Sequence, residues 1–585
     1  MVDTKQEIER KYEATAEEAG PSGRPDLPGL PELTGAGPVA TVVSRGVATL
    51  EATYYDTPGR RLLADGITLR RRTGGDDEGW HLKLPVGPDT REELHAPLGG
   101  EVPAEMAALL RSRVRHDPLR PLAHLHTERD RKDLVAADGT VLAEVSVDRV
   151  TARRLAPEDG EPVRWTEVEV ELAEGRGHDE RLLDAVETRL CDGGLHRADS
   201  PSKLAKALAE TERGAVAAET GGGGGPGRSA GPGKPAKPGK PEKAGRLGRL
   251  GRAEKPERAG KPAKAGKPVK PGKPAKTARE VEQAAPAARR PLGADDVVLD
   301  YVRRQLDALV RLDPAVRRDL PDAVHRMRVA TRRLRSAFRS YRKVLDRTVT
   351  DPVGDELKWL AGELGVERDR EVLTERLAGR LAELPDDLRR GPVRDRLRHW
   401  SRGRRDGARA TVLRALDSER YLTLLDTLDA LVADPPLRPA AAKPAGPVAA
   451  KAVLRDYERL AGRVATALKT PPGPDRDVAV HQARKAAKRV RYAAETARPA
   501  LGKPAKKFAR RMRAVQDVLG DHQDSVVARE ALRTLAAQAH GAGESDFTFG
   551  LLHGREEARA AARERELPGL WAEVSRPEHR AALGA

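Results

Sequence analysis

Cysteine is almost absent from this chain of 585 residues, in which Cys191 stands alone. A single cysteine excludes internal disulfides and cysteine-rich zinc sites, as is usual in a reducing compartment. Aromatic residues make up 3% of the chain, too few to recognise nucleic acid mainly by base stacking. No apolar run is long enough to span a bilayer or to act as a signal peptide, so we expect a cytoplasmic protein without membrane contact.

Charged residues, in contrast, make up 34% of the chain and are unevenly distributed. The net charge is −12 over residues 1–220, +14 over 221–290 and +15 over 291–585. Since a chain of this length exceeds one hydrophobic core, the three parts indicate separate units. We predict an α+β multidomain protein with a first domain at 1–215, a linker at 216–290 and a second domain at 291–580.

The linker is rich in lysine, proline and glycine, with eight Lys-Pro dipeptides and 11 of the 27 lysines of the chain. This composition cannot form a packed core, which predicts a disordered, extended polycation. Its role is either that of a spacer kept open by its own charge or that of a nonspecific tether for polyanions, nucleic acid included.

Short segments of alternating polarity recur through the first domain, separated by turns such as DTPG, GGDDEG and AADGT. About eight of them, from QEIERKYEA at 6–14 to WTEVEVELA at 165–173, are typical of antiparallel strands in a barrel or a sandwich. Two helices are predicted beside them, at Glu105–Arg113 and Asp179–Cys191.

Acidic and basic side chains are sorted onto different strands of this domain. Glu7 and Glu9 share one face of a strand, because side chains alternate with a period of two, and Arg70 and Arg72 share one face of another. A half-buried sheet with its charged side in water explains any one strand. If a barrel closes with these charges inward, its lumen has an acidic and a basic wall, which suits a metal-bound polyphosphate.

The motifs of this domain resemble those of the CYTH superfamily, the triphosphate tunnel metalloenzymes, which includes inorganic triphosphatases, thiamine triphosphatases and class IV adenylate cyclases. They are EIERK at 7–11, YYDTP at 54–58, TLRRR at 68–72, HLKLP at 81–85, Arg129 with Arg131, VSVD ending at Asp148, EVEVE at 167–171 and SPSK ending at Lys203. The resemblance covers residues 2–208 and implies an eight-stranded antiparallel tunnel that hydrolyses a triphosphate with a metal.

The same resemblance assigns roles to two groups of residues. It implies Mg²⁺ or Mn²⁺ ligands among Glu7, Glu9, Asp148, Glu167, Glu169 and Glu171, where spacing leaves open which two of the last three bind. It implies triphosphate contacts from Lys11, Arg70, Arg72, Lys83, Arg129, Arg131 and Lys203. Lys11 is in addition the candidate catalytic base for the attacking water.

The second domain has the pattern of an all-α bundle and contains an internal duplication. HRMRVATRRLR from His325 aligns with HQARKAAKRVR from His481. Each segment is followed by a Leu-Gly-x-x-x-Asp motif, at 364–369 and at 519–524. We predict two copies of one helical unit, at about 295–430 and 450–570.

Each copy carries a basic stripe along one helix face. The stripes are His325, Arg328, Arg332, Arg335 and Arg339 in the first copy and His481, Arg484, Lys488 and Arg491 in the second. The first stripe contains no glutamate to form the i, i+4 pairs of a solvated face. The stripes therefore meet either acidic groups elsewhere in the bundle, such as Asp369 and Asp524, or a bound polyanion.

These helical motifs resemble the CHAD family, named for a conserved histidine in an α-helical domain, over about residues 295–568. The resemblance implies two four-helix bundles that bind inorganic polyphosphate in a basic central groove without catalysis of their own. The expected function is a metal-dependent triphosphatase tethered to a polyphosphate-binding domain and associated with polyphosphate granules. A noncatalytic granule scaffold is one alternative, and a thiamine triphosphatase or adenylate cyclase-like activity is another; the oligomeric state is open.

Overall fold

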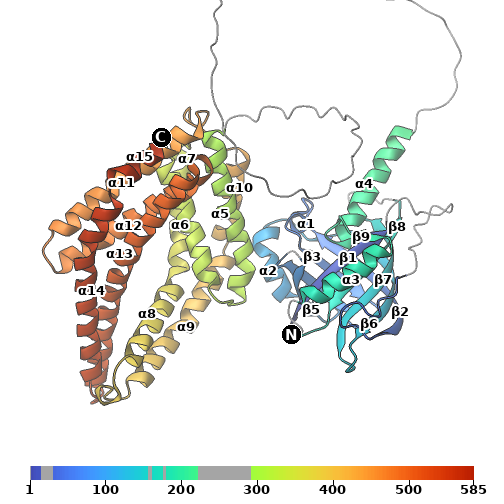
Figure 1. Cartoon of the computed structure of the whole chain (residues 1–585), viewed down its shortest axis with the longest axis horizontal. Coiled ribbons are helices and arrows are strands. Elements are labelled where there is room, and N and C mark those ends of the chain that lie inside the picture. The colour runs from blue at the N-terminus through green and yellow to red at the C-terminus, as the bar shows by residue number, and fades with distance from the viewer. Residues whose placement is uncertain are drawn as a thin grey trace, which may run out of the picture. The chain divides into compact units, whose positions relative to one another are not determined.

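The computed structural model of the chain describes residues 2–14, 30–87, 89–155, 161–175, 179–221 and 292–584, with the side chains of 213–221, 366–371 and 401–406 left out. Strands occur in the first domain and helices make up the second (Figure 1). The predicted linker at 216–290 lies almost entirely outside the described residues. Within them, no helix combines the length and apolarity that crossing a membrane requires.

The first domain is a closed antiparallel barrel of eight strands, which confirms the predicted fold class and excludes the sandwich. The strands are β1 (Asp3–Ala14), β2 (Thr41–Asp56), β3 (Thr68–Thr73), β4 (Gly79–Pro85), β5 (Thr90–Ala96), β6 (Arg120–Val135), β7 (Val141–Arg154) and β8 (Val163–Leu172), and a short β9 (Leu195–Arg197) pairs with the end of β1. The order is β5-β4-β3-β2-β6-β7-β8-β1, and pairing of β5 with β1 closes the barrel.

Apolar side chains of the strands face outward, where helices cover them. The helices are α1 (Arg61–Ala64), α2 (Ala104–Val114), α3 (Glu180–Asp192) and α4 (Lys203–Gly221). Helices α2 and α3 confirm the two predicted helices. Leu182 and Val186 of α3 pack on Tyr12 and Val170, so that the opposite faces of these strands are left to charged residues inside the barrel.

One end of the barrel is filled by apolar side chains. Leu204 and Leu208 of α4 form a buried cluster with Leu125, Val150 and Trp165. Val150 lies on the same face of β7 as the fully buried Asp148, because the two are two residues apart. The charged interior therefore ends at this apolar cluster.

The second domain consists of helices throughout. They are α5 (Ala294–Arg317), α6 (Ala323–Ser340), α7 (Arg347–Glu363), α8 (Gly365–Ala382), the 3₁₀ turn η2 (Asp386–Leu388), α9 (Val393–Asp417), α10 (Glu419–Ala433), α11 (Ala445–Lys469), α12 (Pro474–Thr496), α13 (Arg498–Gly541), α14 (Phe547–Val574) and α15 (Pro577–Gly584). Helix α6 packs between α5 and α7, and α12 packs in the same way between α11 and α13. This repeated order agrees with the duplication seen in the sequence.

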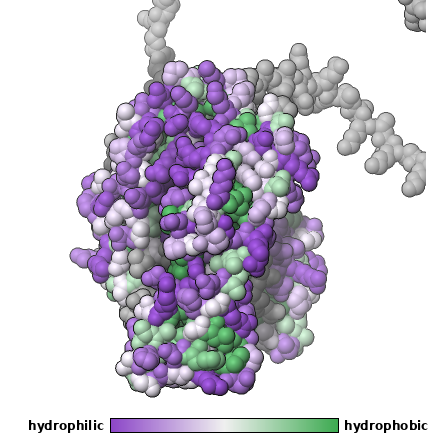
Figure 2. All heavy atoms as spheres, turned by 90° about the vertical axis from the view of Figure 1, so that its left-hand side faces the viewer, coloured by the Kyte–Doolittle hydropathy of each residue, from purple (hydrophilic) through white to green (hydrophobic). Residues whose placement is uncertain are grey.

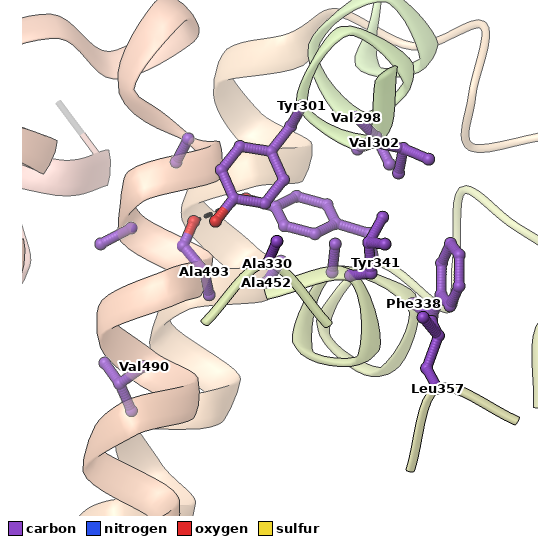
Figure 3. Packing of buried hydrophobic residues seen from close by; sticks show 14 of the residues in the cluster. Val298, Tyr301, Val302, Ala330, Phe338, Tyr341, Leu357, Ala452, Val490 and Ala493 are labelled. Atoms are coloured by element: carbon purple, nitrogen blue, oxygen red, sulfur yellow. Dashed lines mark hydrogen bonds between the residues drawn. The ribbon is translucent and has the colours of Figure 1, made fainter. Parts of the chain in front are cut away.

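Two apolar cores hold these helices together. The larger one joins α5, α6, α7, α9, α10, α11, α12, the first half of α13, the end of α14 and α15. It includes Tyr301 and Tyr341, which lie side by side in Figure 3. The Tyr341 hydroxyl donates a hydrogen bond to the carbonyl of Ala493 (2.9 Å), which ties the end of α6 to α12. The smaller core joins α8, α9, α13 and α14 through residues such as Leu381 and Leu532. The outer face of the helical region drawn in Figure 2 is largely hydrophilic.

The two copies differ at the Leu-Gly motif. In the first copy the chain passes from α7 to α8 at Leu364, whereas in the second copy α13 runs through Leu519 without a break. Both leucines belong to the larger core, but Gly365 and Gly520, which follow them, belong to neither core. The polar stretch after each motif is therefore available to the charged residues of the stripes.

Candidate functional site

A cavity of about 620 Å³ lies inside the barrel, and one of its walls is acidic. Glu7 and Glu9 reach it from β1, and Glu169 and Glu171 reach it from β8. Since Glu9 stands opposite Glu171 in the pairing of β1 with β8, the four carboxylates occupy one patch. Carboxylate oxygens are the ligands that Mg²⁺ and Mn²⁺ prefer, so the donor set fits such a cation.

Basic side chains also line the cavity, with further carboxylates such as Glu93, Asp133 and Glu144 among them. All the side chains predicted to contact triphosphate line this one cavity: Lys11 from β1, Arg70 and Arg72 from β3, Lys83 from β4, Arg129 and Arg131 from β6, and Lys203 from the start of α4. The structure thus brings together residues that are almost 200 positions apart in the sequence.

Each carboxylate of the acidic wall contacts a cation of the same cavity. The pairs are Lys83 Nζ with Glu7 Oε2 (2.5 Å), Arg91 Nε with Glu9 Oε1 (3.0 Å), Lys11 with Glu169, and Lys5 Nζ with Glu171 Oε1 (2.6 Å). Lys11 also contacts Glu9, and Lys83 also lies 3.8 Å from Glu93, so these two cations bridge pairs of carboxylates. A phosphate oxygen could replace a carboxylate as the partner of such a cation.

Glu7 and Glu9, the two carboxylates of the EIERK motif, differ in their pKa values. Burial raises the pKa of Glu7 to about 8, and Glu93 adds to this effect while Lys83 opposes it. Burial acts in the same direction on Glu9, but Lys11, Lys83 and Arg91 outweigh it and hold the pKa of Glu9 at about 2. Glu7 is thus a buried carboxyl that a bound cation would ionise, which further fits a metal beside it.

Asp148 and Glu167 take a different position from the other predicted metal ligands. With Glu169 they form a compact buried cluster, but the ammonium of Lys203 lies within it, at 2.9 Å from Asp148, 2.8 Å from Glu167 and 2.6 Å from Glu169. Arg129 also donates two hydrogen bonds to Asp148 (2.8 and 2.6 Å). Of the three late glutamates, therefore, Glu169 and Glu171 line the cavity and Glu167 lies behind Lys203.

Sequence reasoning missed other residues of the cavity, among them His81, Arg91 and Glu93. The Nδ1 atom of His81 lies 2.9 Å from a carboxylate oxygen of Glu93, and Nε2 lies 2.9 Å from the carbonyl oxygen of Asp77. Burial lowers the pKa of His81 to about 4, so the ring is neutral at pH 7. Arg91, Glu93 and His95 alternate in the sequence and therefore share one face of β5. Assigning that face to the cavity required knowing that β5 pairs with β1.

A second charged site lies between the matched stripes of α6 and α12. Arg328 and Arg332 of α6 and Arg484 of α12 surround Lys488. Burial and these three guanidiniums lower the pKa of Lys488 to about 7, an effect that requires the two stripes to share one space. We call this space, with its continuation past Arg335 and Arg339, the basic groove.

The duplicated glycines lie directly against the arginines of the groove. A side chain built on Gly365 would place its Cβ 3.0 Å from Nη2 of Arg328, and one on Gly520 would place its Cβ 3.6 Å from Nε and Nη2 of Arg484. Arg328 and Arg484, which correspond in the two copies, thus pack on the corresponding glycines. The glycine of each Leu-Gly motif leaves room for an arginine side chain. Asp524 lies 3.4 Å from Arg484, as the sequence suggested, and the side chain of Asp369 is outside the described residues.

A cavity of about 330 Å³ lies further along the stripe of α6. It is lined by Arg335, Arg339, Arg342, Arg347, Arg459 and Arg489, together with residues that include Asp351 and Asp355. Arg335 and Arg339 were predicted here, whereas Arg459 and Arg489 come from faces that the stripes did not include. Cations therefore outnumber acids along this cavity.

The remaining stripe residues lie at the margins of the groove. His325 is half-buried in the first turns of α6. His481 is hydrogen-bonded to Gln523, and burial, with Lys485 and Arg484 nearby, lowers its pKa. Arg491 turns toward Glu495 (3.5 Å) and lies over the ring of Tyr492, 4.7 Å from its centre.

Residues 5–207 match the family model of the CYTH domain, and residues 300–533 match that of the CHAD domain. The chain joins a CYTH domain to a CHAD domain. CYTH domains are triphosphatases or cyclases that depend on a metal, and the barrel of this chain is a triphosphate tunnel.

Relatives of the CYTH and CHAD pair extend along the whole chain. An uncharacterized protein of Mycobacterium tuberculosis (strain CDC 1551 / Oshkosh) is 36% identical over 572 residues, which cover 96% of this chain and 94% of the relative. Among solved structures, PptA from Streptomyces chartreusis shares 24% identity at a TM-score of 0.42, over 48% of this chain and 100% of its own. The CHAD domain of the plant Ricinus communis shares 26% identity at a TM-score of 0.40, over 50% of this chain and 95% of its own.

Proposed function

We propose that the CYTH domain hydrolyses inorganic triphosphate, or a related short phosphate chain, with Mg²⁺ or Mn²⁺, and that the CHAD domain binds inorganic polyphosphate. One observation carries the catalytic part: a single cavity brings Glu7, Glu9, Glu169 and Glu171 together with the seven basic side chains predicted to contact triphosphate. A metal alone would need only the first group, and a phosphate alone only the second.

Glu7, Glu9, Glu169 and Glu171 would hold the metal, which supplies polarisation of the phosphoryl oxygens and an activated water. Arg70, Arg72, Arg129 and Lys203 neutralise the charge that develops on the phosphoryl oxygens during transfer. Lys11 contacts both Glu9 and Glu169, which sets its ammonium against the residues that would hold the metal. Its role as a base stays a prediction.

The lining of the cavity favours an inorganic chain over a nucleotide or thiamine triphosphate. Among the described lining residues, the aromatic rings are those of Tyr54, His81 and His95. Arg70 donates a hydrogen bond to the Tyr54 hydroxyl (3.3 Å), and His81 is hydrogen-bonded to Glu93. Both rings are therefore engaged with charged side chains of the cavity. The apolar cluster of α4 fills one end of the barrel, where a base or a thiazole ring would otherwise extend.

Replacing Glu9 and Glu169 by glutamine should lower phosphate release from triphosphate by about a hundredfold or more, because the acidic wall loses two of its four anionic ligands. The measurement is phosphate release with Mg²⁺ or Mn²⁺ by the full chain. Glu51→Gln is the matched control, because Glu51 lies on β2 and contacts His126 (2.6 Å) without lining the cavity. Equal release by the double variant and the wild type would contradict the catalytic role of the acidic wall, and absence of release by the wild type would leave the noncatalytic scaffold as the explanation.

Polyphosphate binding by the CHAD domain is supported by the seated arginines. Gly365 and Gly520 let Arg328 and Arg484 pack closely against the helices, where their guanidiniums can bind phosphate oxygens. An extended polyanion could follow the groove from this pair to Arg339 and Arg489. We further propose that polyphosphate granules are the site of action, with the linker contributing at most nonspecific contacts to polyanions.

A further inference from the structure

The β3–β4 turn, at residues 74–78, borders the barrel cavity and carries two carboxylates, those of Asp76 and Asp77. Both residues are among those that line the cavity. The Asp76 side chain is 87% exposed and that of Asp77 is 59% exposed. Solvent therefore reaches the lining at this turn, which makes it a place where a dissolved anion meets the cavity.

Both carboxylates of the turn contact arginines that are predicted to bind triphosphate. Asp77 contacts Nη2 of Arg72, and Oδ2 of Asp76 lies 2.8 Å from Nη1 of Arg131. Arg131 also donates hydrogen bonds to Glu144 from Nε (3.1 Å) and Nη2 (2.9 Å), so Asp76 takes the third nitrogen of this guanidinium. The turn thus holds carboxylate oxygens at two of the guanidiniums on which the proposed function places phosphate oxygens.

The barrel fixes the backbone of this turn. Gly74 and Gly79 flank the two carboxylates with positive φ angles of 81° and 150°. A Cβ on either glycine would overlap a backbone carbonyl oxygen of β2 or β5. Between them, the carbonyl oxygen of Asp77 lies 2.9 Å from Nε2 of His81. Because the backbone is held in this way, the carboxylates of Asp76 and Asp77 have a high effective concentration at their guanidiniums.

We propose that the β3–β4 turn competes with substrate, so that a phosphate chain must displace the carboxylates of Asp76 and Asp77 to reach Arg131 and Arg72. The inference rests on the proposed hydrolysis of triphosphate and adds two residues that set the affinity of the cavity for its substrate.

A phosphate chain has two advantages over the carboxylates of the turn. Further cations of the same cavity, such as Lys83 and Arg129, can hold the chain while its other groups approach the turn. The Nε atom of Arg72 is buried and has no hydrogen-bond partner among the described residues, so a phosphate can use a donor that Asp77 leaves free. The exchange is therefore favourable, but breaking the two ion pairs of the turn reduces its net gain.

Asp76→Asn/Asp77→Asn tests the competition, because it removes both charges and keeps the size of both side chains. The control is Asp3→Asn/Glu174→Gln, which removes the same charge from the same cavity. Asp3 and Glu174 are exposed residues of the lining, and neither is paired with a cation among the described residues. A difference between the two double variants therefore reports on the broken ion pairs and not on net charge.

The probe is inorganic triphosphate, titrated by calorimetry into the full chain in metal-free buffer, where the proposed metal-dependent turnover does not proceed. We expect Asp76→Asn/Asp77→Asn to bind triphosphate about tenfold more tightly than the wild type, and the control to gain less than about threefold. With Mg²⁺, the KM of Asp76→Asn/Asp77→Asn should fall by a similar factor at unchanged kcat, because the turn competes with binding and not with bond cleavage.

Equal affinity of the wild type and Asp76→Asn/Asp77→Asn, or an equal gain in the control, would overturn the competition while leaving triphosphate binding intact. A loss of affinity in Asp76→Asn/Asp77→Asn would show that the turn supports binding, and it would overturn the competition as well. Absence of triphosphate binding by all three proteins would instead overturn the proposed function of the cavity, and the competition with it.

Discussion

Replacing Lys203 by methionine should abolish triphosphate turnover and destabilise the CYTH domain by about 3–5 kcal/mol, because it leaves buried carboxylates without their cation. Lys203 is 8% exposed, and its ammonium contacts Asp148, Glu167 and Glu169. Arg129 still contacts Asp148 and Glu169, whereas among the described residues Lys203 is the cation that contacts Glu167. Methionine retains the length and the apolar stem of lysine, so the loss reports on charge.

The control is Lys206→Met, one turn further along α4. The Lys206 ammonium contacts Glu13 and lies 5.6 Å from the centre of the Trp165 ring, near the surface of the barrel. The pair with Glu13 is itself largely buried, but Lys206 contacts one carboxylate where Lys203 contacts three, so its loss should cost less than the loss of Lys203. Scanning calorimetry of the full chain measures both variants. Equal destabilisation by the two substitutions would mean that Lys203 acts by packing and not as the counter-ion of the cluster.

Low pH and added Mn²⁺ provide two further tests of the role of Lys203. Arg129 and Lys203 lower the pKa of Asp148, so their contribution is complete above the ordinary carboxyl pKa of about 4 and is lost as the pH falls through the lowered one. The difference between wild type and Lys203→Met should therefore shrink in acid. Mn²⁺ should raise the melting temperature of the variant more than that of the wild type, because the emptied cluster offers three carboxylates to a cation.

The strands and their inward charges were predictable because a period of two fixes which side chains share a face. Glu7, Glu9, Arg70 and Arg72 follow directly from it, and all line the cavity. Position along the barrel was not predictable in the same way. Asp148 and Glu167 have the correct face, but they lie toward the end that the apolar cluster of α4 fills, and only the position of Lys203 shows this.

In the helical domain, a period of 3.6 predicts which side chains share a helix face, but it does not predict which neighbouring helix they meet. The pattern placed Arg484 and Lys488 correctly, but it gave no means of choosing between Arg489 and Arg491 at the end of the stripe. That choice depends on where the neighbouring helix lies, since Glu495 and Tyr492 draw Arg491 away. The role of the glycines in the Leu-Gly motif was likewise hidden, because it arises from contacts with another helix.

Neutralising the centre of the groove should abolish polyphosphate binding and at the same time stabilise the CHAD domain. In Arg332→Gln/Lys488→Gln, one cation of each copy is removed while most of each side chain is retained. Affinity for polyphosphate should fall about a hundredfold or more, since two charge-assisted contacts are lost. Without polyanion, the melting temperature of the domain should rise by a few degrees, because repulsion that lowers the pKa of Lys488 is relieved.

A matched variant separates the groove from net charge. Lys506→Gln/Arg513→Gln removes the same charge from α13, where both residues are exposed and Arg513 lies 3.8 Å from Asp517. It should change neither affinity nor stability appreciably, and triphosphate turnover should be unaffected in both double variants. Retention of polyphosphate by Arg332→Gln/Lys488→Gln at moderate salt would instead assign binding to the basic linker, which deletion of residues 221–290 would test. A gain in stability together with a loss of binding is the result that a purely structural arginine cluster cannot give, because arginines that hold the fold together lower its stability when they are removed.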